Sequence, residues 1–282
     1  LRVRRQWSWP NLGFVGPQIM AVLNITPDSF SDGGFYRDRV DLDLVFAHAE
    51  RCLSEGATIL DVGGESTRPG AKPVSEAEEL ARVIPVIEGL ASRFDAVISV
   101  DTSTPQVMIA AARAGARLIN DVRALQREGA LAAALETGLP VCLMHMQGTP
   151  QTMQHRPDYD DAVSEVFQWL MHRIDVCLDA GFSADQLLID PGFGFGKTLE
   201  HNIALFQHLD LFVQTGYPVL VGVSRKSMVG EITGRPVEQR ATASAVAAAI
   251  AASHGAAILR VHDVSETRDA MTVMQTLTQG MQ

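Results

Sequence analysis

Cysteine is scarce in this sequence of 282 residues. The three cysteines, Cys52, Cys142 and Cys177, are odd in number and lie far apart. They form neither a disulfide framework nor the close ligand spacing of a zinc site. We therefore interpret them as buried apolar side chains and predict a reducing, cytoplasmic location.

Long hydrophobic runs and clusters of basic residues are missing as well. The most apolar stretch, residues 241–252, is rich in alanine and too short to span a membrane. The first ten residues carry three arginines but no apolar core of a secretory signal. The net charge is −10, and no run of Lys and Arg offers a surface for nucleic acid. These features predict no membrane or nucleic-acid partner, and an anionic substrate would need positive charge local to its site.

One pattern recurs along the chain: a helical segment ends in glycine, an apolar run follows, and the run closes on a polar residue. Glycine ends helices because it adopts the left-handed conformation at little cost. A continuous apolar run is typical of a strand buried on both faces. The pattern predicts eight strands, at residues 18–23, 58–62, 96–100, 118–119, 141–144, 187–189, 219–223 and 258–261.

Segments with a helical pattern, such as residues 42–54 and 238–253, lie between these strands. Parallel strands need such crossovers, and eight strand–helix units predict an α/β fold of the (β/α)8 TIM barrel type. An open, doubly wound sheet is the alternative, but it usually has fewer strands and a glycine-rich first turn. We expect one barrel domain over residues 18–282, preceded by an N-terminal extension over residues 1–17.

Polar residues follow or close the predicted strands, and in a barrel these strand ends meet on one face. Lys226, Arg260 and His262 together suit an anion with several phosphate oxygens. The complete set comprises Asn24, Asp61, Asp101, Asn120, Asp121, His145, Asp190, Ser224, Arg225, Lys226, Arg260, His262 and Asp263. The set predicts a polar pocket rich in carboxylates and bases.

Structural roles explain several of these residues equally well. Asp61, Asp121 and Asp263 could each cap the helix that follows, and His145 could be a structural imidazole. The histidines show no metal-ligand pattern, and no G-x-S-x-G elbow indicates a covalent nucleophile. Two connections, residues 26–39 and 64–73, are long enough to be functional lids.

The segment PGFGFGKT, residues 191–198, resembles a nucleotide P-loop but fails its spacing. That motif requires a glycine five positions before Gly196, where this sequence has Pro191. We interpret Gly192, Gly194 and Gly196 as letting the loop pass close to a flat ligand.

Longer motifs resemble the signatures of the dihydropteroate synthase family of pterin-binding enzymes. They begin with MAVLNITPDSFSDGG (residues 20–34), ILDVGGESTRPGA (59–71) and ISVDTSTP (98–105). LINDV, LMHMQGTP, LIDPGFGFGKT, VGVSRKSMVG and LRVHDV follow in the family's order, so the resemblance extends from about residue 18 to the C-terminal helix. It implies a transferase of folate biosynthesis that joins 7,8-dihydropterin-6-ylmethyl diphosphate to 4-aminobenzoate. Pyrophosphate leaves and 7,8-dihydropteroate forms. The family is typically homodimeric and inhibited by sulfonamides.

The resemblance also assigns the pterin site. Asp190 and Asn120 would read the pterin edge, Lys226 would donate to the opposite side of the ring, and Met144 and Phe195 would pack against it. Asp101 would contact the pterin and stabilise the positive charge that develops as pyrophosphate leaves.

The remaining implied roles concern the diphosphate and the second substrate. The diphosphate would be held by Asn24, Thr67, Arg260 and His262, with Asn24 helping to place the cofactor Mg²⁺. Asp101, Lys226, Arg260 and Asn24 form the implied catalytic set. The 4-aminobenzoate pocket would be built from Phe30, Thr67, Arg68, Pro69 and Ser227, with Lys226 nearby, after loop closure on the bound diphosphate.

Three alternatives remain at this point. A pterin-binding methyltransferase domain shares the barrel and the pterin-reading carboxylates but does not need Arg260 and His262. A non-catalytic paralogue should have lost some of the catalytic residues, which are all present. A phosphosugar isomerase needs a Glu base opposite a neutral His. Glu65 is the obvious loop glutamate for that role, and we expect it to serve its own loop's hydrogen bonds instead.

Overall fold

The computed structural model describes residues 8–9, 14–26, 35–36, 39–66, 74–148, 153 and 157–279. The expected site residues Phe30, Thr67, Arg68 and Pro69 lie outside this part of the chain.

Eight parallel strands form the centre of the molecule, in the order β10-β9-β8-β7-β6-β3-β12-β11. A further parallel bridge between Ile189 and Val219 connects the two ends of this row and closes it into a barrel. The barrel class and all eight predicted strands are therefore confirmed. Their bounds are β3 (Gln18–Asn24), β6 (Ile59–Gly63), β7 (Val97–Asp101), β8 (Leu118–Asp121), β9 (Val141–Met144), β10 (Leu187–Asp190), β11 (Leu220–Val221) and β12 (Ile258–Val261).

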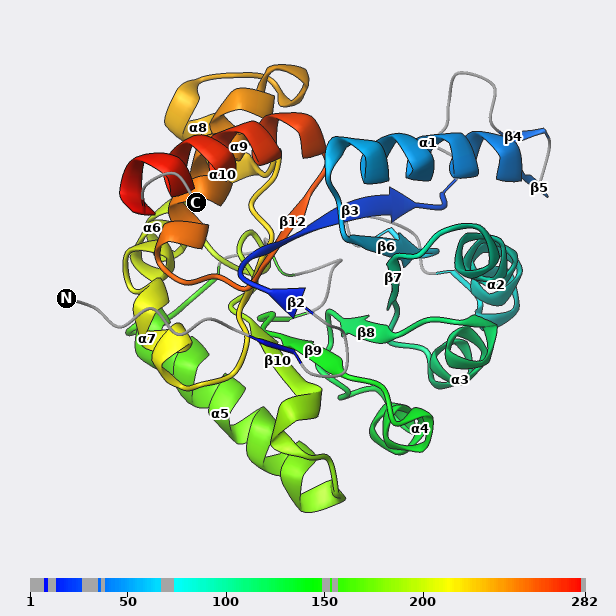
Figure 1. Ribbon diagram of the computed structural model, residues 1–282. Coiled ribbons are helices and arrows are strands. Elements are labelled where there is room, and N and C mark those ends of the chain that lie inside the picture. Colours follow the sequence, from blue (N-terminus) through cyan, green and yellow to red (C-terminus); the bar gives the residue numbers. More distant parts are fainter. Residues whose placement is uncertain are drawn as a thin grey trace.

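Helices surround the strands on all sides (Figure 1). They are α1 (Leu42–Glu55), α2 (Glu76–Arg93), α3 (Pro105–Ala114), α4 (Ala130–Thr137), α5 (Ala162–Ala180), α6 (Leu199–Gln207), α7 (Leu209–Gln214), α8 (Ser227–Thr233), α9 (Ala241–Ser253) and α10 (Val264–Gln279). Among the described residues, no helix combines the length and apolar character that crossing a membrane requires.

Short elements complete the chain. Two antiparallel pairs, β1 (Ser8–Trp9) with β2 (Phe14–Val15) and β4 (Phe35–Tyr36) with β5 (Arg39–Val40), precede α1. Single 3-10 turns, η1 (Ala184–Gln186) and η2 (Val237–Gln239), precede β10 and α9. The second turn explains why the helix expected from residue 238 begins only at Ala241.

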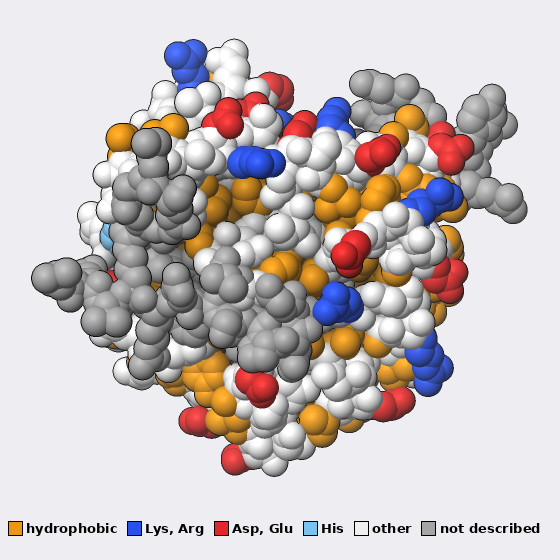
Figure 2. Space-filling model, viewed as in Figure 1, with side chains coloured by type: hydrophobic (Ala, Val, Ile, Leu, Met, Phe, Trp, Pro, Cys, Tyr) orange, Lys and Arg blue, Asp and Glu red, His pale blue; other side chains and the backbone are white. Residues whose placement is uncertain are grey.

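In the space-filling view, acidic and basic side chains are scattered over the described part of this face (Figure 2).

Glycine ends helices as the sequence predicts. Gly56, Gly115 and Gly181 have φ angles of 113°, 111° and 110°, and each donates its backbone N–H to carbonyls of the preceding turn. An L side chain rarely adopts this conformation. The chain therefore turns from helix to strand at fixed points, which sets the length of each strand.

The barrel interior is layered because side chains alternate along each strand. An apolar layer takes one residue from every strand: Met20, Ile59, Val97, Leu118, Cys142, Leu188, Leu220 and Ile258. Two positions further along, the inward-facing residues are Val22, Asp61, Ser99, Asn120, Met144, Asp190, Gly222 and Arg260. Five of these eight are polar, and Asp101 lies two positions beyond Ser99 and Lys226 four beyond Gly222. We call these seven polar residues the polar layer; it lies on the apolar floor, at the carboxyl end of the barrel.

Candidate active site

Arg260 lies between two carboxylates at the centre of the polar layer. Its Nε donates to Asp61 Oδ2 at 2.7 Å, and its Nη2 donates to Asp101 Oδ2 at 2.8 Å. Asn120 Nδ2 also donates to Asp61 Oδ2, at 3.1 Å. Asp61, which the sequence also allowed as a helix cap, is completely buried in this cluster. These bonds bring together four strands, β6, β7, β8 and β12.

Burial controls the ionisation of this cluster. It raises the pKa of Asp101 to about 7, against the attraction of Arg260 and together with the repulsion of Asp61. Burial alone would lower the pKa of Arg260, but the charges of Asp61 and Asp101 outweigh it and raise that pKa. Arg260 therefore remains a cation, while Asp101 is poised to change its charge near neutral pH.

Asp190, Phe195 and Lys226 come from the ends of β10 and β11. Lys226 lies beside Arg260, since a Cβ on Gly222 would lie 3.8 Å from Lys226 Nζ and 3.7 Å from Arg260 Cβ. Lys226 Nζ donates to the carbonyl oxygen of Phe193 and lies 4.6 Å from the centre of the Phe195 ring. Burial lowers the pKa of Lys226 to about 8, partly opposed by Asp190. Asp190 accepts the backbone N–H of Gly192 at 2.7 Å. A cation, an aromatic ring and a buried carboxylate thus converge on one space.

The glycine-rich loop after β10 approaches another loop, rather than only a ligand. Gly192, Gly194 and Gly196 all have positive φ angles. A Cβ on Gly192 would lie 1.8 Å from the carbonyl oxygen of His145, and one on Gly196 would lie 2.6 Å from that of Gln147. Only Gly194 faces a site residue, since its Cβ would lie 3.1 Å from Lys226 Cδ. Gly192 and Gly196 are therefore needed for packing between the two loops, and Gly194 lies beside Lys226 at the mouth.

Lys197 is buried, although no pattern in the sequence distinguishes it. Its Nζ contacts His145 Nδ1 at 3.0 Å and donates to the carbonyl oxygens of Gly192 at 2.9 Å and Phe195 at 3.0 Å. Burial lowers the pKa of Lys197 to about 7 and that of His145 to about 2. His145 also packs edge-on against Trp169. These contacts favour a structural role for His145. Its partner Lys197 belongs to the PGFGFGKT segment, so that segment was the sequence feature from which the contact could have been found.

Asn24 and Asp101 face a notch left by a glycine. A Cβ on Gly63 would lie 3.7 Å from Asp101 Oδ2 and 3.8 Å from Asn24 Oδ1. His262 lies next to Ser224, whose Oγ is 3.1 Å from both the backbone nitrogen and Nδ1 of the histidine. Ser227 begins α8 and is exposed.

Two of the polar strand-end residues serve structure instead. Asp121 accepts the backbone N–H groups of Arg123 at 2.8 Å and Leu125 at 2.7 Å, so it caps the turn after β8. Asp263 forms a two-point ion pair with Arg225.

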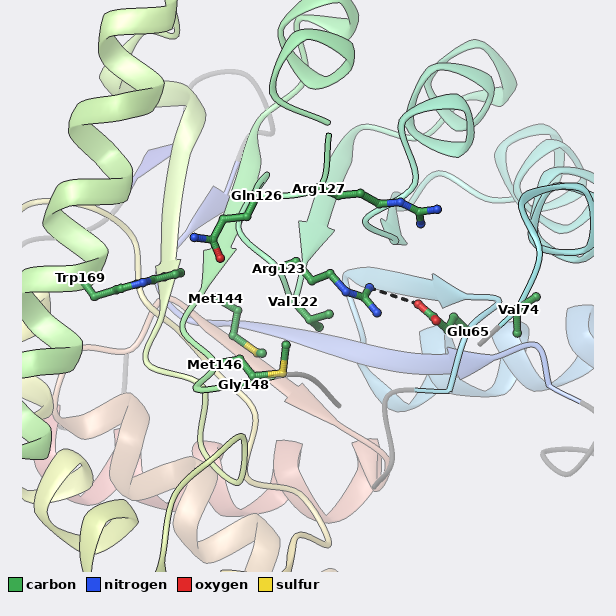
Figure 3. Close-up of a pocket in the computed structure, with 10 residues that line it drawn as sticks. All are labelled: Glu65, Val74, Val122, Arg123, Gln126, Arg127, Met144, Met146, Gly148 and Trp169. Atoms are coloured by element: carbon green, nitrogen blue, oxygen red, sulfur yellow. Dashed lines mark hydrogen bonds and ion pairs between the residues drawn. The ribbon is translucent and has the colours of Figure 1, made fainter. Parts of the chain in front are cut away.

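A cavity of about 440 Å³ opens beside Met144, between the loops after β8 and β9 (Figure 3). Met144, Met146 and Trp169 supply apolar walls, and Arg123 and Glu65 form an ion pair across it at 3.2 Å. The remaining lining residues named in the figure are Val74, Val122, Gln126, Arg127 and Gly148. This volume falls in the range of small-molecule sites.

Comparison with known proteins identifies the family. The model of the pterin-binding enzymes matches residues 20–262. The dihydropteroate synthase of Escherichia coli K12 is 53% identical over 259 residues, which cover 92% of this chain and 91% of that protein. The Yersinia pestis dihydropteroate synthase, solved with a sulfonamide drug, superposes with a TM-score of 0.89 at 54% identity, covering 94% of this chain and 97% of that one.

A second solved structure is the Xanthomonas albilineans dihydropteroate synthase with 4-aminobenzoic acid. Its TM-score is 0.89 at 49% identity, covering 94% of this chain and 95% of that one. The chain therefore belongs to the pterin-binding enzymes and, within them, to the dihydropteroate synthases of folate biosynthesis, which are transferases. This assignment sets aside the methyltransferase and isomerase alternatives.

The contact between Gly192 and the His145 carbonyl gives a testable prediction. Gly192→Ala should destabilise the protein by about 1–3 kcal/mol more than Gly234→Ala, because its Cβ meets backbone. Gly234 is the matched control, since its φ is also positive, at 68°, but nothing lies within 4 Å of its Cβ. Urea unfolding of both variants measures the difference, and equal losses would contradict the packing role.

Proposed function

We propose that this dihydropteroate synthase binds the pterin diphosphate in the barrel mouth, above the apolar floor, and that the polar layer both reads the pterin and carries the reaction. The observation that carries this proposal is the convergence of Asp101, Asn120, Asp190, Lys226 and Arg260 from five different strands or strand ends. In a barrel, only the carboxyl face brings such residues together.

The pterin edge presents an amino group beside a ring N–H, which a carboxylate accepts in two parallel hydrogen bonds. Asp190 takes that role, and Asn120 reads the adjoining edge. Lys226 donates to the opposite side of the ring, and Met144 and Phe195 pack against its faces. The position of Lys226 over the Phe195 ring supports this arrangement. It brings the cation and the ring close to the Asp190 carboxylate, whose charge acts on Lys226.

Pyrophosphate departure leaves positive charge on the pterin methylene and ring. A fixed carboxylate stabilises that charge without reorganising, and Asp101 is the group placed to do so. Arg260 has five N–H donors, of which one on Nε bonds to Asp61 and one on Nη2 bonds to Asp101. Its remaining donors, with Asn24, Thr67 and His262, hold the departing diphosphate. The aromatic amine of 4-aminobenzoate is neutral near pH 7 and needs no dedicated base.

Mg²⁺ fits the donor set at the mouth. The described residues contain no group of three or more His, Cys, Asp or Glu side chains able to hold a metal ion. Mg²⁺ often takes one or two protein oxygens and completes its shell with water and substrate phosphates. The Asn24 amide oxygen beside the Gly63 notch is such a ligand. When bound, the ion neutralises charge on the leaving diphosphate.

The second substrate is 4-aminobenzoate, which we place against Ser227 and Lys226, with Phe30, Thr67, Arg68 and Pro69 completing the pocket. The relative from X. albilineans was solved with 4-aminobenzoic acid, and the one from Y. pestis with a sulfonamide. We propose that sulfonamides occupy the same pocket here. Closure of the two long loops after diphosphate binding would exclude water from the reacting atoms.

The location we infer is cytoplasmic. All three cysteines are free and buried. Unpaired thiols persist most readily in a reducing compartment, and cell fractionation tests the assignment.

Turnover tests the function directly. Purified protein with the pterin diphosphate, Mg²⁺ and labelled 4-aminobenzoate should yield labelled dihydropteroate. Lys226→Ala and Arg260→Ala should each lower kcat/KM by about 100-fold or more, as expected for loss of a charged group at the reacting centre. Arg113→Ala is the control, because that side chain is 78% exposed on α3. Folded wild-type protein that forms no product would sink the proposal.

The ionisation of Asp101 predicts a pH dependence. Below its pKa of about 7 the carboxyl is neutral and cannot attract positive charge. The kcat/KM for the pterin diphosphate should therefore rise with pH through that value, since this parameter reports the free enzyme, and should fall again above about pH 8, where Lys226 loses its charge. Asp101→Asn should lose this rising limb while the ionisations of the substrate remain. A limb with the same midpoint in the variant would contradict the assignment.

We also infer a homodimer through the outer face of α9 and α10. Val246 and Ile250 on α9 are 52% and 43% exposed, and Val273 and Leu277 on α10 are 57% and 81% exposed. The two helices pack side by side (Figure 1). Clustered exposed apolar side chains are typical of an interface. Analytical ultracentrifugation should show a dimer that Val246→Asp weakens, and a monomeric wild-type chain would refute it.

A further inference from the structure

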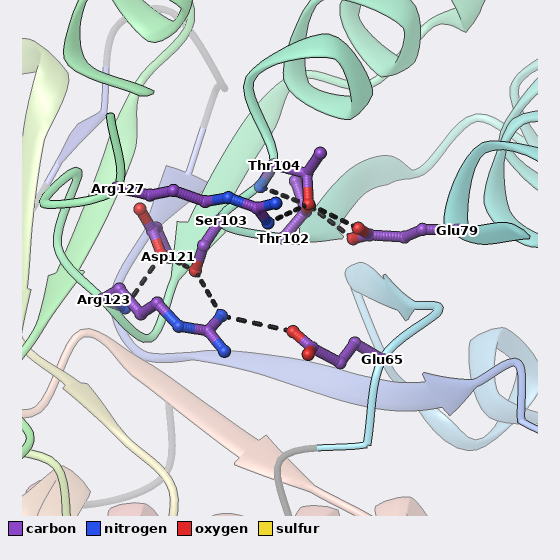
Figure 4. Close-up of polar contacts among 8 residues, drawn as sticks. All are labelled: Glu65, Glu79, Thr102, Ser103, Thr104, Asp121, Arg123 and Arg127. Atoms are coloured by element: carbon purple, nitrogen blue, oxygen red, sulfur yellow. Dashed lines mark hydrogen bonds and ion pairs between the residues drawn. The ribbon is translucent and has the colours of Figure 1, made fainter. Parts of the chain in front are cut away.

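Three hydroxyl residues follow Asp101 directly, and all three are buried. Thr102, Ser103 and Thr104 are 4%, 2% and 1% exposed. Each donates its hydroxyl to a buried carboxylate (Figure 4). Thr102 and Thr104 share Glu79, and Ser103 takes Asp121. The segment after the proposed catalytic carboxylate is therefore held by side chains from two other elements.

Glu79 is a carboxylate where a helix would ordinarily place an apolar residue. It lies on the barrel side of α2 and is only 2% exposed. Within the described residues, no Lys, Arg or His forms an ion pair with it. Burial raises the pKa of Glu79, and the hydroxyls of Thr102 and Thr104 oppose this increase. A buried carboxylate is costly unless its oxygens are hydrogen-bonded, and here each oxygen receives one hydroxyl.

The bonds continue into the backbone next to Asp101. Thr102 Oγ1 accepts the backbone N–H of Thr104 at 3.0 Å, and the backbone N–H of Thr102 donates to the carbonyl of Asn120 at 3.1 Å. Because Thr102 is the neighbour of Asp101, fixing its peptide fixes the direction in which the Asp101 side chain leaves the strand. That side chain then meets Arg260 at 2.8 Å.

A second set of contacts supports the same segment from the neighbouring loops. Arg123 Nη1 donates to Ser103 Oγ at 3.0 Å and to Glu65 Oε2 at 3.2 Å. Arg127 Nη1 donates to Thr104 Oγ1 at 2.7 Å. Among the described residues, Glu65 thus takes a partner from the loop after β8, and most of its own loop, where the sequence places its hydrogen bonds, lies outside them.

We propose that Glu79 is a positioning residue for the transferase reaction. By binding the hydroxyls of Thr102 and Thr104, it holds Asp101 in the orientation that stabilises the developing positive charge. This inference rests on the role proposed above for Asp101. Glu79 forms no hydrogen bond or ion pair with Arg260 or Asp101. It reaches Asp101 through the Thr102–Thr104 segment, and its charge is also among those that raise the pKa of Asp101.

Glu79→Gln tests the inference while keeping the size of the side chain. An amide has only one accepting oxygen, so one hydroxyl loses its acceptor. The kcat should fall by about 10- to 100-fold, as for a reacting group displaced by about an ångström. The KM values should change by less than about threefold, because an interaction made only in the transition state is weakened. Glu88→Gln, at an exposed position on the same helix, should have no effect. An unchanged kcat in Glu79→Gln overturns the inference.

A pair of substitutions at Thr104 separates positioning from folding. Thr104→Val keeps the shape and removes the hydroxyl, whereas Thr104→Ser keeps the hydroxyl. The Thr104 side chain makes no helix-capping bond, so α3 should tolerate both. Val should lower kcat and Ser should retain most of it. Equal kcat values in the two variants overturn the inference, even if Glu79→Gln fails to fold.

The background of Asp101→Asn distinguishes the two levels of the proposal. If Glu79 acts through Asp101, Thr104→Val should cause no further fall in kcat once Asp101 is replaced. A further fall of the same size as in the wild type overturns the positioning role and leaves the role of Asp101 intact. Normal turnover in Asp101→Asn alone overturns both.

Discussion

The guanidinium of Arg260 between Asp61 and Asp101 is the interaction on which the barrel mouth depends. Its partners lie 199 and 159 residues away along the chain. Buried charges are tolerated only when they are paired and hydrogen-bonded, and one fork here serves two carboxylates. Without Arg260, two acidic groups would face each other on neighbouring strands above an apolar floor. The cation therefore allows the chain to keep a dense set of ionisable groups where the substrate must bind.

The layered interior gives that cluster its form. Apolar side chains fill the barrel two positions before the polar layer on every strand. They leave water little access from below, so the charges above them interact in a medium of low dielectric constant. This environment brings the pKa values of Lys226 and Asp101 close to neutral pH. The same burial that stabilises the fold therefore tunes the chemistry.

Local signals in the sequence predicted the fold well. Strands buried on both faces and helices that end in glycine can each be recognised from a few consecutive residues. The polar residues at the strand ends were predicted to converge, and Asp101, Asn120, Asp190, Lys226 and Arg260 do so. The role of Asp61 could not be decided from the sequence, because an aspartate at a strand end can also cap the helix that follows. Its partner is a distant arginine, which no local pattern reveals. Glu79 was missed because a glutamate on an amphipathic helix is ordinarily solvent-exposed.

Lys197 is a second residue whose contacts no local sequence pattern reveals. It lies in a motif that failed as a P-loop, and only the fold reveals that its ammonium group is buried between two loops. The sequence motif was informative, but its function had to come from the three-dimensional contacts.

The partners of Lys197 have a further consequence. Apart from His145, its ammonium group bonds to backbone carbonyl oxygens, which every residue type possesses. At positions other than Gly192 and Gly196, where a Cβ would meet backbone, the loop can therefore exchange side chains without losing this anchor. It cannot gain or lose a residue without moving those carbonyls out of reach. Variation between members of this family should consequently be freer in the composition of this loop than in its length.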